Sequence, residues 1–435
     1  MRKMNKEKDY QYAPATRELT ANATKSIRSN NEINMFEEYF EGEKPEIMSD
    51  TVSTQTIMIF KDPLSHGSIK RSVTKINWHP EPSEGRVAIA YAKLKFQSKD
   101  SVGMAKQAYI WNLNNPNTPE KTLDPHSPLT TLAHNPKIPE SIVGGCYDGS
   151  LCVFDHREGH SSGVIKPSVV TELEKSHHDP VYECYWNQSG KAGKEFFSTS
   201  TDGQLLFWDM RKPEAPVERF DLKDKDQENN PNAKILGGTA MEYNTDAGPT
   251  KFLVGTEQGV ALLVSKRKKI ETQFSFGTTL GAHHGPIYAL ERNPAHVKYF
   301  MSVGDWQAKI WVDEGCFNPI MQTRYHQAYL TDGRWSPQRP GVFFLTRMDG
   351  VLDVWDFYYR QNELAYFQKV SDAPLTSIRI QQQLAAIGDS DGTVSLMHLC
   401  KALTEPAPME KEVMGSIFER ETRRERSLDV AKRLM

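Results

Sequence analysis

The chain has 435 residues, and its 53 lysine and arginine side chains nearly balance 56 aspartate and glutamate side chains, for a net charge of −3. Interspersed charges of both signs give no field that would attract nucleic acid or an anionic membrane, and no window approaches the roughly 18 apolar residues that span a bilayer. The five cysteines include no C-x-x-C pair and fit reduced thiols in a core. We therefore expect a soluble intracellular protein whose partners are proteins.

The first segment, residues 1–50, is predicted to be a polar tail with one amphipathic patch. Four large side chains alternate with glutamates in this patch: Met35, Phe36, Tyr39 and Phe40. A short apolar face on a polar tail becomes ordered when it binds another protein. We interpret these four residues as candidate partner-binding residues.

Residues 51–400 are organised by a repeat. A large apolar residue ends a short strand-like segment seven times, at intervals of 42 to 56 residues: Trp111, Phe154, Trp208, Val264, Trp311, Trp355 and Met397. Most intervals lie near the ~40–45 residues of a four-stranded propeller blade. Within the units, an apolar strand, a strand of small residues, an Asp-Gly turn and a closing strand follow one another. This order predicts an all-β fold, a seven-bladed β-propeller over residues 51–400.

The two ends of the repeat region predict how the ring closes. The seventh unit stops after Leu399 with no further strand behind it, whereas the strand-like segment 51–60 precedes the first unit. Propellers protect their first and last blades by sharing strands between the two ends of the chain. We predict that residues 51–60 supply the missing outer strand of the seventh blade.

The third unit resembles a WD repeat, and this resemblance predicts a side-chain network. In WD repeats a histidine at the start of the blade donates a hydrogen bond to the aspartate of the turn and so ties strands together. The positions that match are His177, Asp202 and Trp208 in the third unit and His283, Asp305 and Trp311 in the fifth. The first unit has Ala105 and the fourth has Gln258 at the aspartate position, so these blades are expected to rely on packing.

No motif in the chain supports catalysis, a metal or a cofactor. The sequence has no G-x-x-x-x-G-K-[ST] loop, no dinucleotide fingerprint after a strand, and no H-E-x-x-H or G-x-S-x-G motif. The histidine pairs at 177–178 and 283–284 lie where a blade-start histidine is expected, and no third ligand has a suitable spacing. The basic run at 266–269 is interpreted as a solvated turn rather than a nucleic-acid patch. We expect no enzyme activity.

Three large side chains beside the turn aspartates are candidate partner contacts. Tyr147 and Met348 directly precede the aspartate of their units, and Trp306 directly follows it. These turns are expected on one rim of the ring, and aromatic residues and methionine are enriched in protein interfaces. Local packing is an equally weighted alternative, since single large apolar residues occur on most surfaces.

Residues 401–435 are charge-dense and are predicted to form a C-terminal helix. Glu421 and Glu425 stand one turn apart among arginines, a spacing that supports a helix. Ile417 and Phe418 form an apolar pair at the head of this segment. We interpret them as candidate residues for clasping a neighbouring subunit.

Several strings go beyond what a generic repeat requires. They are N-M-F-E-E-Y-F at 34–40, F-K-D-P at 60–63, H-H-G-P-I-Y-A-L at 283–290, V-G-D-W at 303–306, T-R-M-D-G at 346–350, D-V-W-D-F at 353–357 and S-I-F-E-R-E-T-R-R-E at 416–425. In these strings the chain resembles the second type of WD-repeat intermediate chain of axonemal outer-arm dynein. The likeness extends from the E-E-Y-F patch to the R-E-T-R-R-E segment.

The resemblance implies a non-catalytic scaffold subunit of the outer dynein arm. Its propeller would dock on the tail of a dynein heavy chain beside a second WD-repeat intermediate chain, and would help to assemble the arm and attach it indirectly to the doublet microtubule. The implied location is the axoneme of a cilium or flagellum, with pre-assembly in the cytoplasm. A general WD-repeat adaptor or scaffold in another intracellular complex is the alternative.

Dynein light chains are a further candidate partner. Thr54-Gln55-Thr56 is a T-Q-T core of the kind that the hub light chain binds by adding the peptide to its sheet edge. The favoured interpretation is that these residues begin the ring-closing strand and have no free edge. Members of the family that the chain resembles carry a longer extension before the E-E-Y-F patch than this sequence does, so the resemblance does not extend to light-chain contacts that use such an extension.

Overall fold

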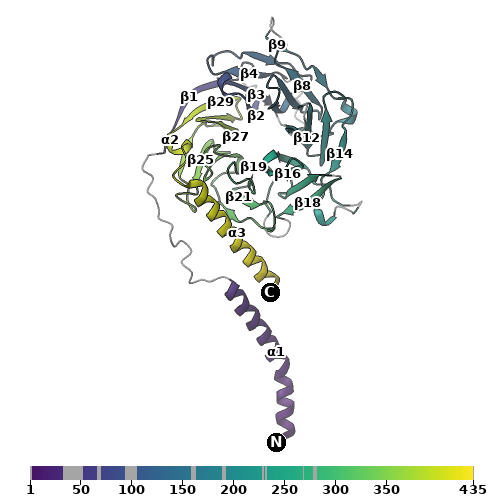
Figure 1. Ribbon diagram of the computed structural model, residues 1–435, viewed down its shortest axis with the longest axis vertical. Coiled ribbons are helices and arrows are strands. Elements are labelled where there is room, and N and C mark those ends of the chain that lie inside the picture. The colour runs from purple at the N-terminus through teal and green to yellow at the C-terminus, as the bar shows by residue number, and fades with distance from the viewer. Residues whose placement is uncertain are drawn as a thin grey trace.

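Seven β-sheets stand around a central channel in the computed structural model (Figure 1). The structure describes residues 2–32, 52–65, 70–93, 105–157, 163–188, 193–227, 230, 233–267, 269–277 and 282–434. In each sheet the first strand of the unit lies next to the channel, and later strands follow outward. The predicted seven-bladed β-propeller is confirmed.

The strands of blades 1 to 4 follow in chain order. Blade 1 contains β2 (Ser72–Trp78), β3 (Arg86–Ala92), β4 (Ala108–Asn112) and β5 (Lys121–Leu123), and β9 (Val164–Ile165) pairs parallel with β5. Blade 2 contains β6 (Leu129–His134), β7 (Ser141–Cys146), β8 (Leu151–Asp155) and β10 (Val169–Val170). Blade 3 contains β11 (Val181–Trp186), β12 (Glu195–Ser200), β13 (Gln204–Asp209) and β14 (Glu218–Asp221). Blade 4 contains β15 (Gly238–Glu242), β16 (Lys251–Thr256), β17 (Ala261–Lys266) and β18 (Ile270–Phe276).

The remaining blades and the helices complete the chain. Blade 5 contains β19 (Ile287–Arg292), β20 (Tyr299–Gly304), β21 (Gln307–Val312) and β22 (Met321–Gln322). Blade 6 contains β23 (Leu330–Trp335), β24 (Val342–Arg347), β25 (Val351–Asp356) and β26 (Tyr366–Lys369). Blade 7 contains β27 (Leu375–Gln381), β28 (Leu384–Asp389), β29 (Thr393–Leu399) and β1 (Thr54–Lys61). The α-helices are α1 (Arg2–Glu32), α2 (Lys401–Thr404) and α3 (Glu410–Leu434).

Small residues in the second strands allow neighbouring blades to approach each other. A Cβ atom on Gly255 of β16 would lie 2.7 Å from Ile287 of the next blade, and a Cβ on Gly388 of β28 would lie 2.5 Å from Val73. Both distances are shorter than van der Waals contact, so glycine is required where these sheets meet. The cores between the blades are otherwise filled by branched and aromatic side chains.

The ring closes through β1, which runs antiparallel to β29 with Thr54 opposite Leu399 and Lys61 opposite Thr393. Thr54-Gln55-Thr56 is therefore paired on one side. The expectation that these residues have no free edge is wrong, because β1 is the outermost strand of its sheet and its other side pairs with no strand of the described residues. Ile57 and Ile59 of β1 are half exposed.

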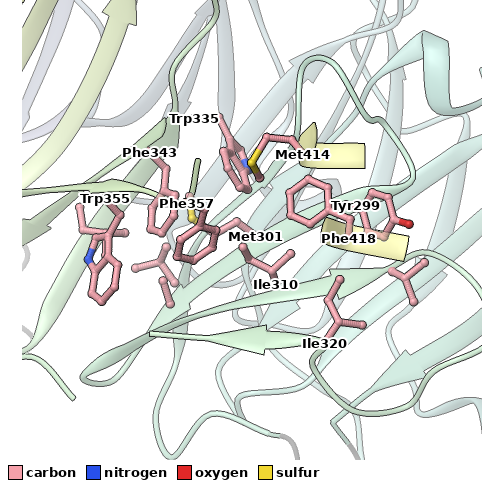
Figure 2. Close-up of a cluster of buried hydrophobic side chains, with 14 of the residues drawn as sticks. Tyr299, Met301, Ile310, Ile320, Trp335, Phe343, Trp355, Phe357, Met414 and Phe418 are labelled. Atoms are coloured by element: carbon pink, nitrogen blue, oxygen red, sulfur yellow. The ribbon is translucent and has the colours of Figure 1, made fainter. Parts of the chain in front are cut away.

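The C-terminal helix packs on the ring. Met414, Ile417 and Phe418 of α3 are buried in the core cluster of blades 5 and 6, where the ring of Phe418 lies 4.7 Å from that of Tyr299 and 6.4 Å from that of Trp335 (Figure 2). The interpretation of Ile417 and Phe418 as contacts for a neighbouring subunit is wrong, because this core within the same chain covers both side chains. The helix itself forms as its charge pattern predicts.

The N-terminal segment contains a helix that sequence patterning did not predict. Helix α1 spans 31 residues and extends away from the propeller, with its C-terminal end beside the end of α3 (Figure 1). Leu19 and Ile27 are exposed on it. Too few apolar residues recur at helical spacing along this segment to produce the usual signature of an amphipathic helix. The patch at Met35, Phe36, Tyr39 and Phe40 lies outside the described residues.

Candidate functional site

Hydrogen-bond chains hold the strands of blades 3 and 5 together. In blade 3, His177 Nδ1 lies 2.9 Å from Asp202, His177 Nε2 lies 2.8 Å from Ser198, and Trp208 donates to the same Ser198 hydroxyl at 3.1 Å. Although burial by itself raises the pKa of Asp202, its hydrogen bond with His177 lowers that pKa below the ordinary value. The structure thus brings the three predicted residues of this blade together, with Ser198 as a fourth.

Blade 5 repeats this arrangement. His283 Nδ1 lies 3.3 Å from Asp305, His283 Nε2 lies 2.7 Å from Ser302, and Trp311 donates to Ser302 at 2.8 Å. Burial lowers the pKa of His283, so the buried imidazole is neutral near pH 7. A buried neutral ring whose Nε2 is bonded to Ser302 and whose Nδ1 faces Asp305 is a structural element rather than a free ligand for a metal. The two serines lie nine or ten residues before their tryptophans, a spacing that was available in the sequence.

A third histidine pair was missed by sequence reasoning. In blade 6, His326 Nδ1 lies 2.7 Å from Asp353, not from the turn residue Asp349, which pairs with Arg347 instead. His326 stands 29 residues before Trp355, close to the 31 and 28 residues that separate the histidines and tryptophans of blades 3 and 5. This spacing would have identified it.

Blade 1 is tied to the ring closure by a buried ion pair. Arg71 Nε lies 2.7 Å from Asp62, which directly follows β1, and Arg71 Nη1 donates to the carbonyl of Gln107 at 2.7 Å. Both charged side chains are almost fully buried. The expectation that blade 1 relies on packing is therefore wrong. An arginine reaching from the start of the blade takes the place of the histidine and turn aspartate found in other blades.

Charged side chains of the first strands form ion pairs between blades. This inner charge belt consists of Lys75, Glu183, Glu242, Glu291, Arg292, Asp332, Arg334 and Arg379. Arg292 lies 3.1 Å from Glu242, and Arg379 lies 2.7 Å from Asp332. Burial lowers the pKa of Lys75 to about 8, against the opposing effect of Glu183, and burial raises the pKa of Glu242 to about 7. The Lys75–Glu183 pair links blades 1 and 3, which are not adjacent, and the other three pairs of the belt each link neighbouring blades.

A ring of equivalent residues surrounds the channel mouth, a cavity of about 430 Å³. Every first strand has a register irregularity near its start, at its second residue or, in β2, at its third, typical of a β-bulge. All seven residues at these positions line the cavity. They are Thr74, Thr130, Tyr182, Thr239, Tyr288, Thr331 and Thr376. Four of the threonines donate to a first-strand carbonyl of the next blade, as Thr376 does to Val73 at 2.6 Å and Thr239 to Ile287 at 2.6 Å.

The two faces of the ring differ. The upper face carries the channel mouth and the turns between second and third strands, because the chain direction alternates from strand to strand. The lower face carries the turns between first and second strands, and α3 covers it at blades 5 and 6. There, His296 contacts the carbonyl of Lys411 at 2.8 Å, and Arg339 lies 2.9 Å from Glu410 and 2.8 Å from Asp356. The upper face is not covered by any described residue in this way.

The three rim candidates all lie in turns of the upper face. Trp306 is 42% exposed and Met348 is 51% exposed, whereas Tyr147 is half-buried. Met348 also lines the channel mouth, and Trp306 packs edge-on against Tyr329 with ring centroids 5.3 Å apart. The upper face therefore presents large apolar side chains to solvent.

Comparison with known proteins identifies the family. The chain is 44% identical to human dynein axonemal intermediate chain 2 over 99% of its own length and 69% of that protein. It is 42% identical to the 70 kDa intermediate chain of the flagellar outer arm of Chlamydomonas reinhardtii, over 98% of this chain and 73% of that one. The chain belongs to the axonemal dynein intermediate chain family. Residues 224–399 match the model of the dynein axonemal intermediate chain 3 WD40 domain.

A more distant intermediate chain also matches. The 78 kDa intermediate chain of the Chlamydomonas flagellar outer arm is 29% identical over 85% of this chain and 53% of its own length. The short sequence motifs predicted a resemblance to outer-arm intermediate chains, and the matches to both Chlamydomonas chains confirm it. The chain is therefore a dynein intermediate chain with a WD40 domain.

One group of potential metal-binding side chains occurs in this intermediate chain among the residues that the structure describes: His126, Cys146 and Asp148. His126 Nε2 lies 3.0 Å from Asp148 and 2.7 Å from Ser150. Both contacts use one ring nitrogen, unlike those of His177, and they account for the proximity of His126 and Asp148 by hydrogen bonding. Within the described ranges, no helix has the length and apolar character needed to cross a bilayer.

Proposed function

We propose that this chain is a non-catalytic scaffold subunit of the outer dynein arm, whose propeller binds the tail of a dynein heavy chain beside a second WD-repeat intermediate chain. The observation that carries the proposal is the 42% identity to a flagellar outer-arm intermediate chain across nearly the whole length of this chain. The proposal places the protein in the axoneme of a cilium or flagellum, with pre-assembly in the cytoplasm and indirect attachment to the microtubule.

The architecture suits a scaffold. Inter-blade hydrogen bonds, the inner charge belt and the β1–β29 closure make the ring a single rigid body. A rigid body loses little conformational entropy on binding and offers a broad surface, as a stable interface of more than about 1,000 Å² requires. Because α3 occupies the lower face at blades 5 and 6, the upper face and the blade edges are the surfaces offered to other subunits.

The upper-face residues Trp306, Met348 and Tyr147 are the proposed contacts with the heavy chain. Large aromatic and thioether side chains in partly exposed positions are the kind that dominate binding energy when a partner desolvates them. The patch at 35–40 remains a proposed contact for a neighbouring subunit. Light-chain binding is proposed for the free outer edge of β1, where Thr54-Gln55-Thr56 already pairs with β29 on its inner side.

Co-purification with outer arms tests the function. Tagged chain expressed in ciliated cells is expected in the high-salt extract that releases outer arms, together with a dynein heavy chain and a second intermediate chain. Trp306→Ala and Met348→Glu are expected to lower heavy-chain recovery about tenfold or more, with unchanged thermal unfolding of the propeller. Phe367→Ala removes a more exposed aromatic residue on β26, 67% exposed, and is the control.

Two results would contradict the proposal. Absence of the chain from the outer-arm extract, with recovery in another intracellular complex, would establish the general WD-repeat adaptor instead. ATP turnover that co-purifies with this chain through every column and disappears in its variants would contradict the non-catalytic assignment.

A further inference from the structure

Two of the seven bulge positions at the channel mouth hold tyrosine instead of threonine. Where threonine occupies this position in blades 1, 2, 4 and 7, its hydroxyl joins the blade to the next one. Tyr182 of blade 3 and Tyr288 of blade 5 make no such hydrogen bond among the described residues. The chain thus lacks two inter-blade bonds at the positions where a phenol ring lines the mouth. Thr331 of blade 6 also makes no bond to the next blade, but it is compensated by a hydrogen bond to Thr346 of its own blade. Departure from a repeated structural rule without a local compensation is a mark of a functional site.

The tyrosine of blade 5 is part of an aromatic wall. The Tyr288 ring lies 6.0 Å from the Tyr329 ring at 73°, and the Tyr329 ring lies 5.3 Å from Trp306 at 74°. A Cβ on Gly285 would lie 2.2 Å from the Tyr329 hydroxyl, so the Tyr329 side chain lies directly on this backbone. Tyr288 is 39% exposed and Trp306 is 42% exposed. The wall is therefore preorganised by edge-to-face packing while two of its members still face solvent.

The charge beside this wall is negative. Burial raises the pKa of Tyr182, and the nearby carboxylates of Glu257 and Asp179 raise it further. Burial contributes most to the raised pKa of Tyr288, the neighbouring tyrosines contribute less, and Glu257 contributes least of these. Glu257 and Asp179 are exposed, and neither has an ion-pair partner among the described residues. Lys75 is the one cation that lines the cavity in the described part of the chain, and its ammonium is paired with Glu183.

We propose that this aromatic mouth, where Tyr182, Tyr288 and Met348 line the cavity and Tyr329, Trp306 and Glu257 stand beside it, binds an arginine side chain presented by a segment of a partner protein. Aromatic faces attract a cation, and unpaired carboxylates next to them add charge complementarity. A guanidinium stacks flat on an aromatic ring and is weakly hydrated, which favours arginine over lysine. Met348 offers an apolar contact to residues flanking the arginine. The inference rests on the proposed function, because it specifies the chemistry that the propeller recognises on another subunit.

Titration of the purified chain with short peptides tests the inference. The probe is acetyl-Gly-Leu-Arg-Leu-Gly-amide, and the matched probe replaces arginine with citrulline, which keeps the shape and removes the charge. The arginine peptide is expected to bind at least about tenfold more tightly than the citrulline peptide and to weaken as salt rises. Equal binding of the two peptides, or no binding of the arginine peptide, overturns the inference.

Variants assign the binding to the mouth. Tyr288→Thr installs the residue that most blades carry, so the fold is expected to be retained while arginine selectivity falls about tenfold. Glu257→Gln is expected to lower affinity several-fold and to reduce the salt dependence. Phe367→Ala, on an exposed strand outside the mouth, should change neither. Unchanged selectivity in Tyr288→Thr places binding elsewhere and overturns the inference.

The two proposals fail separately. A chain that co-purifies with a dynein heavy chain but shows no arginine selectivity overturns the inference and leaves the scaffold function standing. An arginine-selective mouth on a chain that is absent from outer arms overturns the scaffold function and leaves the mouth standing.

Discussion

Removal of the Phe418 side chain tests whether α3 is an integral part of the propeller. Phe418 is fully buried, with its ring between Tyr299, His296 and Trp335 at centroid distances of 4.7, 5.9 and 6.4 Å (Figure 2). Phe→Ala substitutions in cores cost about 3–5 kcal/mol. Because α3 lies at the surface of the ring and can settle into part of the cavity, we expect the lower end, about 3 kcal/mol. Each 1.4 kcal/mol is tenfold, so the docked helix should become about a hundredfold less favoured.

Hydrogen exchange measures this effect locally. In Phe418→Ala the backbone amides of α3 should exchange about a hundredfold faster than in the unmodified chain, while the second and third strands of blades 1 to 3 keep their protection. Arg423→Ala on the exposed side of the same helix is the matched control and should change exchange by less than threefold. Equal exchange of the α3 amides in the two variants would refute the reasoning that Phe418 anchors the helix.

Three further predictions concern the ring. His177→Ala leaves Asp202 and Ser198 without their histidine partner, and we expect it to lower the free energy of unfolding in urea by about 2–4 kcal/mol. His178→Ala, a substitution at the exposed neighbouring position, should lower it by less than about 0.5 kcal/mol. Similar values for both variants would show that the blade 3 network is not stabilising. Arg71→Met breaks the buried ion pair with Asp62 at the ring closure and should lower the free energy of unfolding by about 3–5 kcal/mol. Lys70→Met breaks the exposed ion pair with Asp391 and should lower it by less than about 1 kcal/mol. Thermal unfolding measures both effects. Burial raises the pKa of Glu242 to about 7, so between about pH 4.5 and 7 the folded chain keeps a proton that the unfolded chain has lost, and stability falls as pH rises through this window. Glu242→Gln should remove about 3 kcal/mol of this pH dependence, and a difference between the two chains that is constant from pH 4.5 to 8 would contradict the assignment.

Much of the fold could be predicted from the sequence because a propeller repeats the same local structural requirements seven times. Each blade needs an apolar inner strand, small residues where sheets meet, and a turn with positive φ, as at Gly203 and Gly350. These demands recur at a nearly constant spacing and so become visible without homologues. The pairing of His177 with Asp202 was predictable for the same reason, since both residues lie in one repeat.

Contacts between distant repeats were not predictable in this way. Lys75 and Glu183 come from blades 1 and 3, which no local period relates, and only the closed ring brings them together. Arg71 and Asp62 are nine residues apart in the chain, but Asp62 follows a strand of blade 7 and Arg71 precedes blade 1, so ring closure makes them partners. The mouth tyrosines were likewise ordinary strand residues in the sequence. Their common environment became apparent once all seven bulge positions were found around one cavity.

The sequence by itself determined the architecture, the family and the helical character of the C-terminal segment, because these depend on local periodicity and on strings of consecutive residues. Tertiary structure decided which apolar residues remain available to partners. Ile417 and Phe418 had the same apolar character as Trp306 and Met348, but α3 folds back onto blades 5 and 6 and buries the first pair, while the upper face leaves the second pair in solvent. Burial is a property of what lies opposite a residue in space, and neighbours in the chain do not specify it.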